Sequence, residues 1–264
     1  MRLVWPLEGT SPRAAPEREL DRDGLAELYA HPEGVLRVNF VASADGAVAV
    51  GGVSSGLEAP GDRTVFGLLR ELADVILVGA GSVRAEGYRG ARTSPEREAR
   101  RRARGQAPVP PIAVVSTRGD LDPASPLFTD TAVAPLVLLT GATPSIARDT
   151  APDTVRSALA GAGAEVVDVG GDPGSTADAV VAALADRGLS RVLCEGGPAL
   201  FGALLDAGRV DELCLSLAPQ LEGGAAGRIV AGAGAGGPRP LHLASVVAHD
   251  DGLLLRYQVG GARP

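Results

Sequence analysis

The chain has 264 residues, 45% of them hydrophobic, and a net charge of −7, which allows a large core but excludes a basic nucleic-acid surface. No apolar run reaches the length of about 18 residues that a membrane-spanning helix needs. Cys194 and Cys214 lie in apolar stretches and are too few for a disulfide framework or a zinc site. Because the N-terminus also lacks a signal-peptide pattern, we expect a cytoplasmic protein.

The first 33 residues are mixed in character and are expected to form an N-terminal extension that packs on one large domain, residues 34–264. A short helix is predicted in the extension, within DGLAELYA. In the domain, the first strong helical pattern is DRTVFGLLRELAD, for which Asp62 is the expected N-cap. Later helices are expected at residues 152–163, 175–188 and 198–208.

Between the helices lie short runs that are apolar throughout, which is typical of strands buried on both faces. They are expected at residues 35–43, 75–79, 112–116, 135–140, 164–170, 191–195 and 212–218. Strands that alternate with helices in this way predict an α/β fold, with a mainly parallel central sheet and helices on both faces. The chain then closes with residues 241–250 and 252–260, which predict a C-terminal antiparallel hairpin turning at Gly252.

Two polar segments interrupt this alternation. The first, about residues 86–111, carries an arginine-rich run, PEREARRRARGQ, that also holds two glutamates. A solvated helix or loop is favoured for this run over a phosphate-binding patch. The second is the glycine-rich stretch AGAGAGGPRP at residues 231–240, which is expected to be a mobile surface loop because no helix follows it.

The stretch EGGPALFG follows the strand predicted at residues 191–195. In an open α/β sheet, loops at the carboxyl ends of parallel strands face the ligand crevice. Gly196 and Gly197 would expose backbone N–H groups to a pyrophosphate at a helix start, where Pro198 suits the first position. Glu195 would be repelled by phosphate and is expected to face a hydrogen-bond donor on a substrate. The alternative is a plain glycine turn beside a solvated carboxylate.

Three more loops follow predicted parallel strands. ILVGAGSVRAEGY begins a glycine pattern at Gly79, but Arg84 breaks the Rossmann fingerprint, so only Ser82 is a candidate phosphate ligand. In NFVASADG, Asp45 is either a turn residue or an acid near the reacting centre. The run Ser116-Thr117-Arg118 could bind a 2′-phosphate. All four loops would open on the same edge of the sheet.

Taken in order, VASADG, LRELADVILVGAGSVRAE, CEGGPALFGALLDAGRVDEL and LAPQLEGG resemble the reductase domain of riboflavin biosynthesis. This pyrimidine-reductase family has a dihydrofolate-reductase-like fold, and the resemblance covers residues 35–259. It implies a homodimer, a reduced nicotinamide donor, usually NADPH, and a pyrimidine ribityl or ribosyl phosphate substrate.

The resemblance also implies site residues. It suggests substrate contacts at Ser55, Arg70 and Glu195. It suggests cofactor contacts at Val41, Leu57, Ser82, Glu86, Ser116 and the run of Gly197, Pro198, Ala199, Leu200 and Phe201 up to Ala203.

The sequence departs from the family in three places. Leu57 replaces a frequent aromatic residue, and Glu86-Gly87-Tyr88 stands where the family commonly has D-N-P. The zinc deaminase of the bifunctional relatives is also missing, since no P-C-x-x-C motif occurs. A stand-alone reductase with an altered pocket is therefore expected.

The expected reaction is hydride transfer from the nicotinamide C4 to C1 of the substrate's ribose, in its open-chain imine or aldehyde form. Asp45 is favoured as the proton donor, with a bound water as the alternative. No metal is expected, because the three histidines show no ligand spacing. Two other functions stay open: a pteridine reductase related to dihydrofolate reductase, and a dinucleotide-binding module without turnover.

Overall fold

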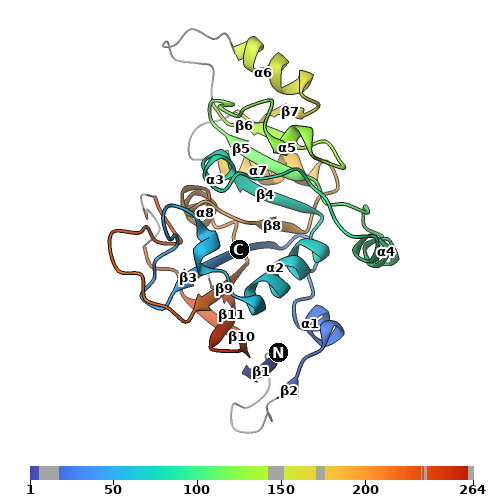
Figure 1. The fold of residues 1–264 in the computed structure, drawn as a ribbon. Helices are drawn as coiled ribbons and strands as arrows, with labels where there is room; N and C mark the ends of the chain where they lie inside the picture. The colour runs from blue at the N-terminus through green and yellow to red at the C-terminus, as the bar shows by residue number, and fades with distance from the viewer. Residues whose placement is uncertain (6–17, 142–151, 171–175, 233, 235–236, 261–264) are drawn as a thin grey trace.

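The computed structural model describes the chain except for residues 6–17, 142–151, 171–175, 233, 235–236 and 261–264. One sheet of eleven strands runs through the described part, as Figure 1 shows. In chain order the strands are β1 (Arg2–Trp5), β2 (Arg18–Glu19), β3 (Leu36–Ser43), β4 (Val75–Gly79), β5 (Ile112–Ser116), β6 (Leu136–Leu139), β7 (Glu165–Asp168), β8 (Val192–Cys194), β9 (Glu212–Ala218), β10 (Leu241–His249) and β11 (Gly252–Val259).

The strand order across the sheet is β2-β1-β10-β11-β9-β3-β8-β4-β5-β6-β7. The strands from β9 to β7 in that order run parallel to one another. On the other side of β9, strands β11, β10, β1 and β2 each pair antiparallel with their neighbour. The expected mainly parallel sheet and its closing hairpin, β10–β11, are therefore confirmed. The hairpin turns at Asp250–Asp251, with Asp250 at a φ of +49°, and not at Gly252, which is the first residue of β11.

Helices cover both faces of the sheet, as expected. They are α1 (Arg22–Leu28), α2 (Pro60–Leu72), α3 (Ala80–Glu86), α4 (Pro95–Ala103), α5 (Pro126–Thr129), α6 (Pro152–Gly161), α7 (Thr176–Ala185) and α8 (Pro198–Asp206), together with a short 3₁₀ helix, η1 (Ser54–Leu57). None of the helices in the described ranges is long and apolar enough to cross a membrane.

The strands are apolar throughout because successive side chains point to opposite, equally covered faces. Within β4, Leu77 packs with α7 and α8, whereas its neighbour Val78 packs with α3, α5 and α6 on the other face. Helices α1 and α2 extend this second layer over Leu193 and Cys214 (Figure 1). Aliphatic side chains therefore form a core on each side of the sheet.

The described part of the N-terminal extension is built into this fold. Strand β1 pairs antiparallel with β10, with Arg2 opposite Ala248 and Leu3 opposite Val247. Leu25 and Leu28 of α1 are buried in the core under α2. These residues therefore extend the sheet and cover part of one face.

The start of α2 differs from the expectation. The helix begins at Pro60, and its N-cap is Ala59, which makes no side-chain capping bond. Asp62 was wrongly predicted as the N-cap, because proline at the first helical position places the N-cap three residues earlier. Asp62 instead lies buried in the first turn, where its Oδ1 accepts a hydrogen bond of 2.6 Å from Ser216 Oγ.

The arginine-rich run forms the helix α4, in agreement with the prediction of a helix or loop. Part of this helix is buried and is not exposed to solvent as expected. Arg101 is completely buried. Its Nη1 donates to the carbonyl oxygens of Glu71 and Ala73, and its Nε donates to the carbonyl oxygen of Ala107. Arginine donors at a helix C-terminus satisfy carbonyls that have no intrahelical partner. Arg101 therefore holds the end of α2.

A carboxylate at the end of α2 collects several more arginines. The side chain of Glu71 is only 2% exposed and pairs with Arg22, Arg97, Arg100 and Arg104. Arg100 binds it through two hydrogen bonds, of 3.0 and 2.9 Å. This cluster joins α1, α2 and α4.

The glycine-rich stretch packs partly on the domain. The amide of Ala231 donates a 3.0 Å hydrogen bond to the carbonyl oxygen of Pro198, at the start of α8. A Cβ at Gly202 would overlap the carbonyl of Ala231, so this approach requires a glycine. Residues 233, 235 and 236 lie outside the described part, and the mobility of the stretch stays a prediction.

Replacing Glu71 by Gln should lower the free energy of unfolding at pH 7 by roughly 3 kcal/mol, because a buried ionic cluster loses its carboxylate. Burial acts to raise the pKa of Glu71, but hydrogen bonds from Arg100, Arg22 and Arg104 outweigh it and lower the pKa from 4.5 to about 2. A depressed carboxyl pKa gives stability that is present above the unfolded value and is lost as the pH falls towards 2. The effect of Glu71→Gln should therefore be smaller at pH 3.

Urea denaturation of the wild type and the variant at both pH values measures this effect. Glu98→Gln is the matched control, because Glu98 forms only an exposed i,i+4 pair with Arg102 on α4. The control should change stability by less than about 1 kcal/mol. Equal losses in the two variants at pH 7 would contradict a stabilising role for the buried cluster.

Candidate active site

The loops after β3, β4 and β8 come together at one edge of the sheet. The amide of Gly79, at the end of β4, donates a 2.8 Å hydrogen bond to the carbonyl oxygen of Gly196, just past β8. Ser82 in α3 lies against Gly197. The amide of Ser54, in the segment that follows β3, donates a 2.8 Å bond to Glu86 at the end of α3. Candidate residues from three separate segments are thus neighbours.

The two glycines after β8 are required by their surroundings. Gly196 has a φ of +85°, and a Cβ there would lie 2.6 Å from the ring of Phe40, which stacks on Phe201. A Cβ on Gly197 would lie 2.5 Å from Ser82 Oγ. The peptide bond between these two glycines is cis. Gly196 therefore needs a residue without a side chain, and a side chain at Gly197 would displace the Ser82 hydroxyl.

Gly197 is the N-cap of α8 and provides no capping side chain, while Pro198 occupies the first turn as expected. The amides of that turn have no intrahelical acceptor, and the positive end of the helix dipole lies here. Gly196 contributes less than expected, because its amide faces the Cys194 thiol. Burial raises the pKa of Cys194 to about 12, and this contact acts against the rise. The uncapped first turn and Ser82 together fit a phosphate group.

Glu195, next to these glycines, lies at the centre of a polar cluster. Its side chain is 2% exposed and accepts two hydrogen bonds from Arg70, Nε to Oε1 at 2.6 Å and Nη2 to Oε2 at 2.7 Å. The hydroxyl of Tyr88 donates a third bond to Oε2 at 2.8 Å. The guanidinium of Arg70 lies 4.4 Å from the ring centre of Phe66 and 5.9 Å from that of Tyr88. Arg70 is thus held by one carboxylate and two aromatic rings.

This cluster has a fixed charge state. Burial and then the charge of Glu195 raise the pKa of Tyr88 well above its ordinary value, so the phenol stays a donor. Burial acts to lower the pKa of Arg70, but its pairing with Glu195 raises the pKa overall. The bonds to Glu195 use Nε and one N–H of Nη2, and the side chain of Arg70 is 34% exposed. Nη1 can therefore donate to an anionic or carbonyl oxygen of a ligand.

The structure brings the implied substrate residues Arg70 and Glu195 into direct contact. Ser55 lies exposed on η1, which also carries the buried Leu57. Glu86 contributes by anchoring η1 through its bond to Ser54. The sequence reasoning missed Tyr88 and Phe66, although the replacement of D-N-P was the signal that pointed to Tyr88.

Asp45 has a different environment from the one expected of a proton donor. It accepts hydrogen bonds from Ser43 Oγ and from the amides of Gly223, at 2.7 Å, and Glu222, at 3.2 Å. The Ser43 hydroxyl and then these two amides lower the pKa of the exposed Asp45 to about 2. A carboxyl group with this pKa is ionised near neutral pH and holds no proton to give. Asp45 joins two loops instead.

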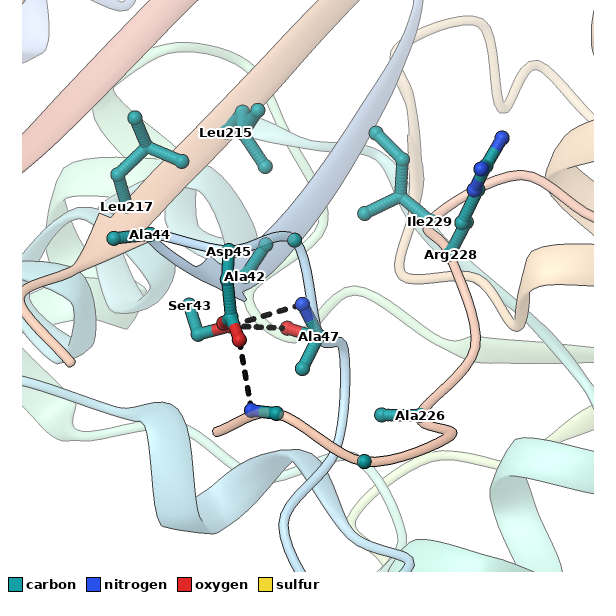
Figure 2. Close-up of a pocket in the computed structure, with 13 residues that line it drawn as sticks. Ala42, Ser43, Ala44, Asp45, Ala47, Leu215, Leu217, Ala226, Arg228 and Ile229 are labelled. Atoms are coloured by element: carbon teal, nitrogen blue, oxygen red, sulfur yellow. Dashed lines mark hydrogen bonds between the residues drawn. The ribbon is translucent and has the colours of Figure 1, made fainter. Parts of the chain in front are cut away.

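Asp45 also lines a cleft of about 450 Å³, shown in Figure 2. The cleft includes Ala42, Leu215 and Leu217, and the Arg228 guanidinium points away from Asp45. Because side chains alternate along strands, these residues face the side of the sheet that carries α8. Arg70 and Glu195 lie on the α2 side. The cleft of Figure 2 is therefore separate from the Arg70–Glu195 cluster.

The proposed 2′-phosphate residues are only partly available. Ser116 is buried, and its Oγ accepts a 2.9 Å hydrogen bond from the amide of Gly119 to close a turn. Arg118 is 81% exposed and pairs with Asp120, as does Arg84 from α3. The basic group beside this loop is therefore Arg84 with Arg118, flanking Asp120. Sequence reasoning had treated Arg84 only as a break in a glycine motif. Thr117 Oγ1 accepts a weak, 3.5 Å bond from Thr140.

In the part of the chain that the structure describes, no group of three or more His, Cys, Asp or Glu residues is arranged to hold a metal ion. Both cysteines are free and buried.

A family model, the RibD C-terminal domain, matches residues 35–255, so the chain belongs to that family. Among solved structures, a pyrimidine reductase-like protein from Corynebacterium diphtheriae is similar, with 25% identity and a TM-score of 0.78 over 89% of this chain and 98% of that chain. The riboflavin biosynthesis reductase Rib7 of Saccharomyces cerevisiae shares the fold, with 16% identity and a TM-score of 0.59 over 86% and 90% of the two chains. No curated protein was found to match the chain.

The bifunctional deaminase and 5-amino-6-(5-phosphoribosylamino)uracil reductase of Thermotoga maritima also shares the fold, with 17% identity and a TM-score of 0.63. The match covers 86% of this chain and 57% of that protein. The family recognised from the sequence is thus confirmed. Membership of this family supports a pyrimidine-reductase role and an oxidoreductase activity.

Gly196→Ala should lower the free energy of unfolding by roughly 2 kcal/mol or more, because alanine is strained at positive φ and its Cβ would overlap Phe40. Gly81→Ala is the control, since Gly81 lies in α3 with open space around its Cβ position. Alanine there should raise stability by up to about 1 kcal/mol. Thermal and urea unfolding of both variants check the pair, and a neutral Gly196→Ala would show that the glycine turn is not constrained.

Proposed function

We propose that this chain is an NADPH-dependent reductase of a pyrimidine ribosyl phosphate of the 5-amino-6-(5-phosphoribosylamino)uracil type. The observation that carries the proposal is the cluster of Arg70, Glu195 and Tyr88, placed directly beside the glycine turn. An anion-binding guanidinium and a phosphate-compatible helix start then lie at the same edge of the sheet. A phosphorylated substrate and a dinucleotide need these two features side by side.

On the cofactor side, the amides of Gly197 and the first turn of α8 would bind the pyrophosphate, with Ser82 as a further donor. Val41 and Leu57 supply apolar contact, and Arg84 with Arg118 would bind a 2′-phosphate in exchange for Asp120. When bound, a reduced nicotinamide supplies the hydride. The chain's own contribution is to position the reactants and to exclude water.

On the substrate side, Nη1 of Arg70 would bind an anionic oxygen of the substrate. Glu195 fixes the plane of the guanidinium through two bonds, and Tyr88 fixes Glu195. Ser55 adds a hydroxyl from η1. Glu195 therefore acts mainly by orienting Arg70, since its two oxygens already accept three hydrogen bonds.

Oxidation of NADPH, followed by its absorbance, tests the function directly. The wild type should oxidise NADPH with the pyrimidine ribosyl phosphate and not with dihydrofolate. Glu195→Gln should lower kcat/KM by about ten-fold or more, because a charge-assisted pair is lost, while the Kd for NADPH changes little. Glu33→Gln, which alters only an exposed ion pair with Arg191, is the control.

Three other results would contradict the proposal in different ways. Turnover with dihydrofolate alone would favour a pteridine reductase. Cofactor binding without any turnover would favour a dinucleotide-binding module. Full activity of Glu195→Gln on the pyrimidine substrate would remove the cluster from the mechanism.

The wild type should bind NADPH more tightly than NADH. Replacing Arg118 by Gln should weaken NADPH binding by about ten-fold and leave NADH binding unchanged, because a charge-assisted contact to phosphate contributes roughly 1.5–3 kcal/mol. Titration of both cofactors into both proteins gives the four dissociation constants. Equal affinity of the wild type for the two cofactors would contradict a 2′-phosphate site.

We also propose a homodimer, formed through the sheet face next to the cleft of Figure 2. Leu253 of β11 lies opposite Leu217 of β9, and Leu255 lies opposite Leu215. Within the described residues, the core packed by α7 and α8 reaches Leu215 but not the other three. Leu253 is 39% exposed. A second copy of the chain would cover this apolar surface.

Sedimentation at micromolar concentration should give twice the single-chain mass of 26.6 kDa. Leu253→Asp should shift the protein towards the single-chain mass, because a charge would be buried in the interface. Leu221→Asp, a similar change at a leucine on the neighbouring loop, is the control for added charge. A wild type that sediments as a monomer would contradict the dimer.

A further inference from the structure

Asp62 is a buried carboxyl group that has no role in the proposed binding of cofactor and substrate. It lies in the first turn of α2 and is 7% exposed. Its Oδ1 accepts the 2.6 Å bond from Ser216 of β9, which is itself buried. In the register of β3 and β9, Ser216 lies directly opposite Val41. The carboxyl group therefore sits over the strand residue expected beside the cofactor.

These residues line a small cavity. It has a volume of about 10 Å³ and is bordered by Asp62, Ser216, Val41 and Leu57, with residues of the β10–β11 hairpin on its far side. This volume is about the minimum that holds one water molecule, and a buried water needs polar partners of the kind that Asp62 and Ser216 provide. Most of the lining is apolar, so a water in this cavity would be held by Asp62 and Ser216, next to Val41 and Leu57.

Helix α2 contributes a residue both to the cavity and to the Arg70–Glu195 cluster. Asp62, Phe66 and Arg70 are spaced four residues apart on α2, so they lie along the same side of the helix, over about 12 Å. Leu57 lies on η1, which Glu86 anchors, and two residues after Glu86 the Tyr88 hydroxyl binds Glu195. Asp62 thus lies in the first turn of α2, and Arg70, which binds Glu195, lies in its last turn.

The groups around Asp62 favour its protonated form. Burial raises its pKa, and the hydrogen bond from Ser216 acts against this rise. Glu58 also raises the pKa and Arg63 lowers it, and these two side chains pair with each other at 3.0 Å. The charge of Asp62 contributes to the raised pKa of the buried phenol of Tyr29. The ring of His249 from β10 packs on Gly61, next to Asp62.

We propose that Asp62 supplies the proton of the reduction through one water molecule bound in the Asp62–Ser216 cavity. The inference rests on the proposed function. The hydride forms the new C–H bond, and the π electrons of the substrate C=N or C=O bond move to the heteroatom. That atom takes a proton from the water, which takes one from Asp62. The Ser216 hydroxyl stabilises the resulting carboxylate, and solvent returns the proton after product leaves.

The test compares Asp62→Asn and Ser216→Ala with the wild type in kcat, in its pH dependence and in NADPH affinity. Asp62→Asn should lower kcat by about 100-fold or more, the usual contribution of a general acid, with an unchanged Kd for NADPH. In the wild type, kcat should fall as the pH rises through the pKa of Asp62, and this limb should be absent in Asp62→Asn. Ser216→Ala should keep the limb but move it to higher pH, because the carboxylate loses a hydrogen bond.

The pH dependence of Tm gives a readout that does not need turnover. A raised carboxyl pKa means that the folded state holds its proton more tightly, so wild-type stability falls as the pH rises above the unfolded value near 4. Asp62→Asn should lack this fall. Asp62→Asn with normal kcat and an intact pH limb overturns the inference alone. A wild type that reduces no substrate overturns the proposed function, and this inference with it.

Discussion

The ion pair between Arg70 and Glu195 is the interaction on which the candidate site depends. It joins α2 to the end of β8, two elements far apart in the sequence, through two short hydrogen bonds. A carboxylate buried to this extent is costly without a partner, so each charge needs the other to stay in place. With Phe66 and Tyr88 against the guanidinium, one edge of Arg70 is fixed and one nitrogen is left for a ligand.

Helix α2 can position Arg70 accurately because neighbouring elements hold the helix on two sides. Arg70 points to the site, while the next residue, Glu71, points about 100° away into the arginine cluster that joins α1 and α4. Arg101 then binds the last carbonyls of the helix. The arginine-rich segment touches the Glu195 cluster only at the backbone of Arg70, whose carbonyl oxygen accepts a 3.4 Å hydrogen bond from Arg101 Nη1 within the described residues, and it fixes the helix that carries Arg70. Rigid support of this kind is what positions a binding group accurately.

The fold was predictable from the sequence because its strands and helices depend on local patterns, namely apolar runs, helical spacing and the glycine turn. The site was predictable only in part. Glu195 was singled out by its place after a predicted strand, and Arg70 was named through family resemblance. Their direct pairing, and the positions of Tyr88, Phe66 and Ser216 beside Arg70, Glu195 and Asp62, arise from contacts between distant segments. The surroundings of Asp45 were hidden for the same reason, since the amides that lower its pKa come from the Glu222–Gly223 loop. Local propensity carries no information about such partners.

The most direct measurement compares kcat/KM of Arg70→Lys on the phosphorylated pyrimidine substrate and on the same compound without its phosphate. Lysine keeps the charge but cannot bind Glu195 through two bonds and still present a free, oriented donor. If Arg70 is the anion-binding group, the variant should lose about ten-fold or more on the phosphorylated substrate and little on the other. Equal losses on both compounds would contradict the assignment of Arg70 and its pairing with Glu195 to substrate binding.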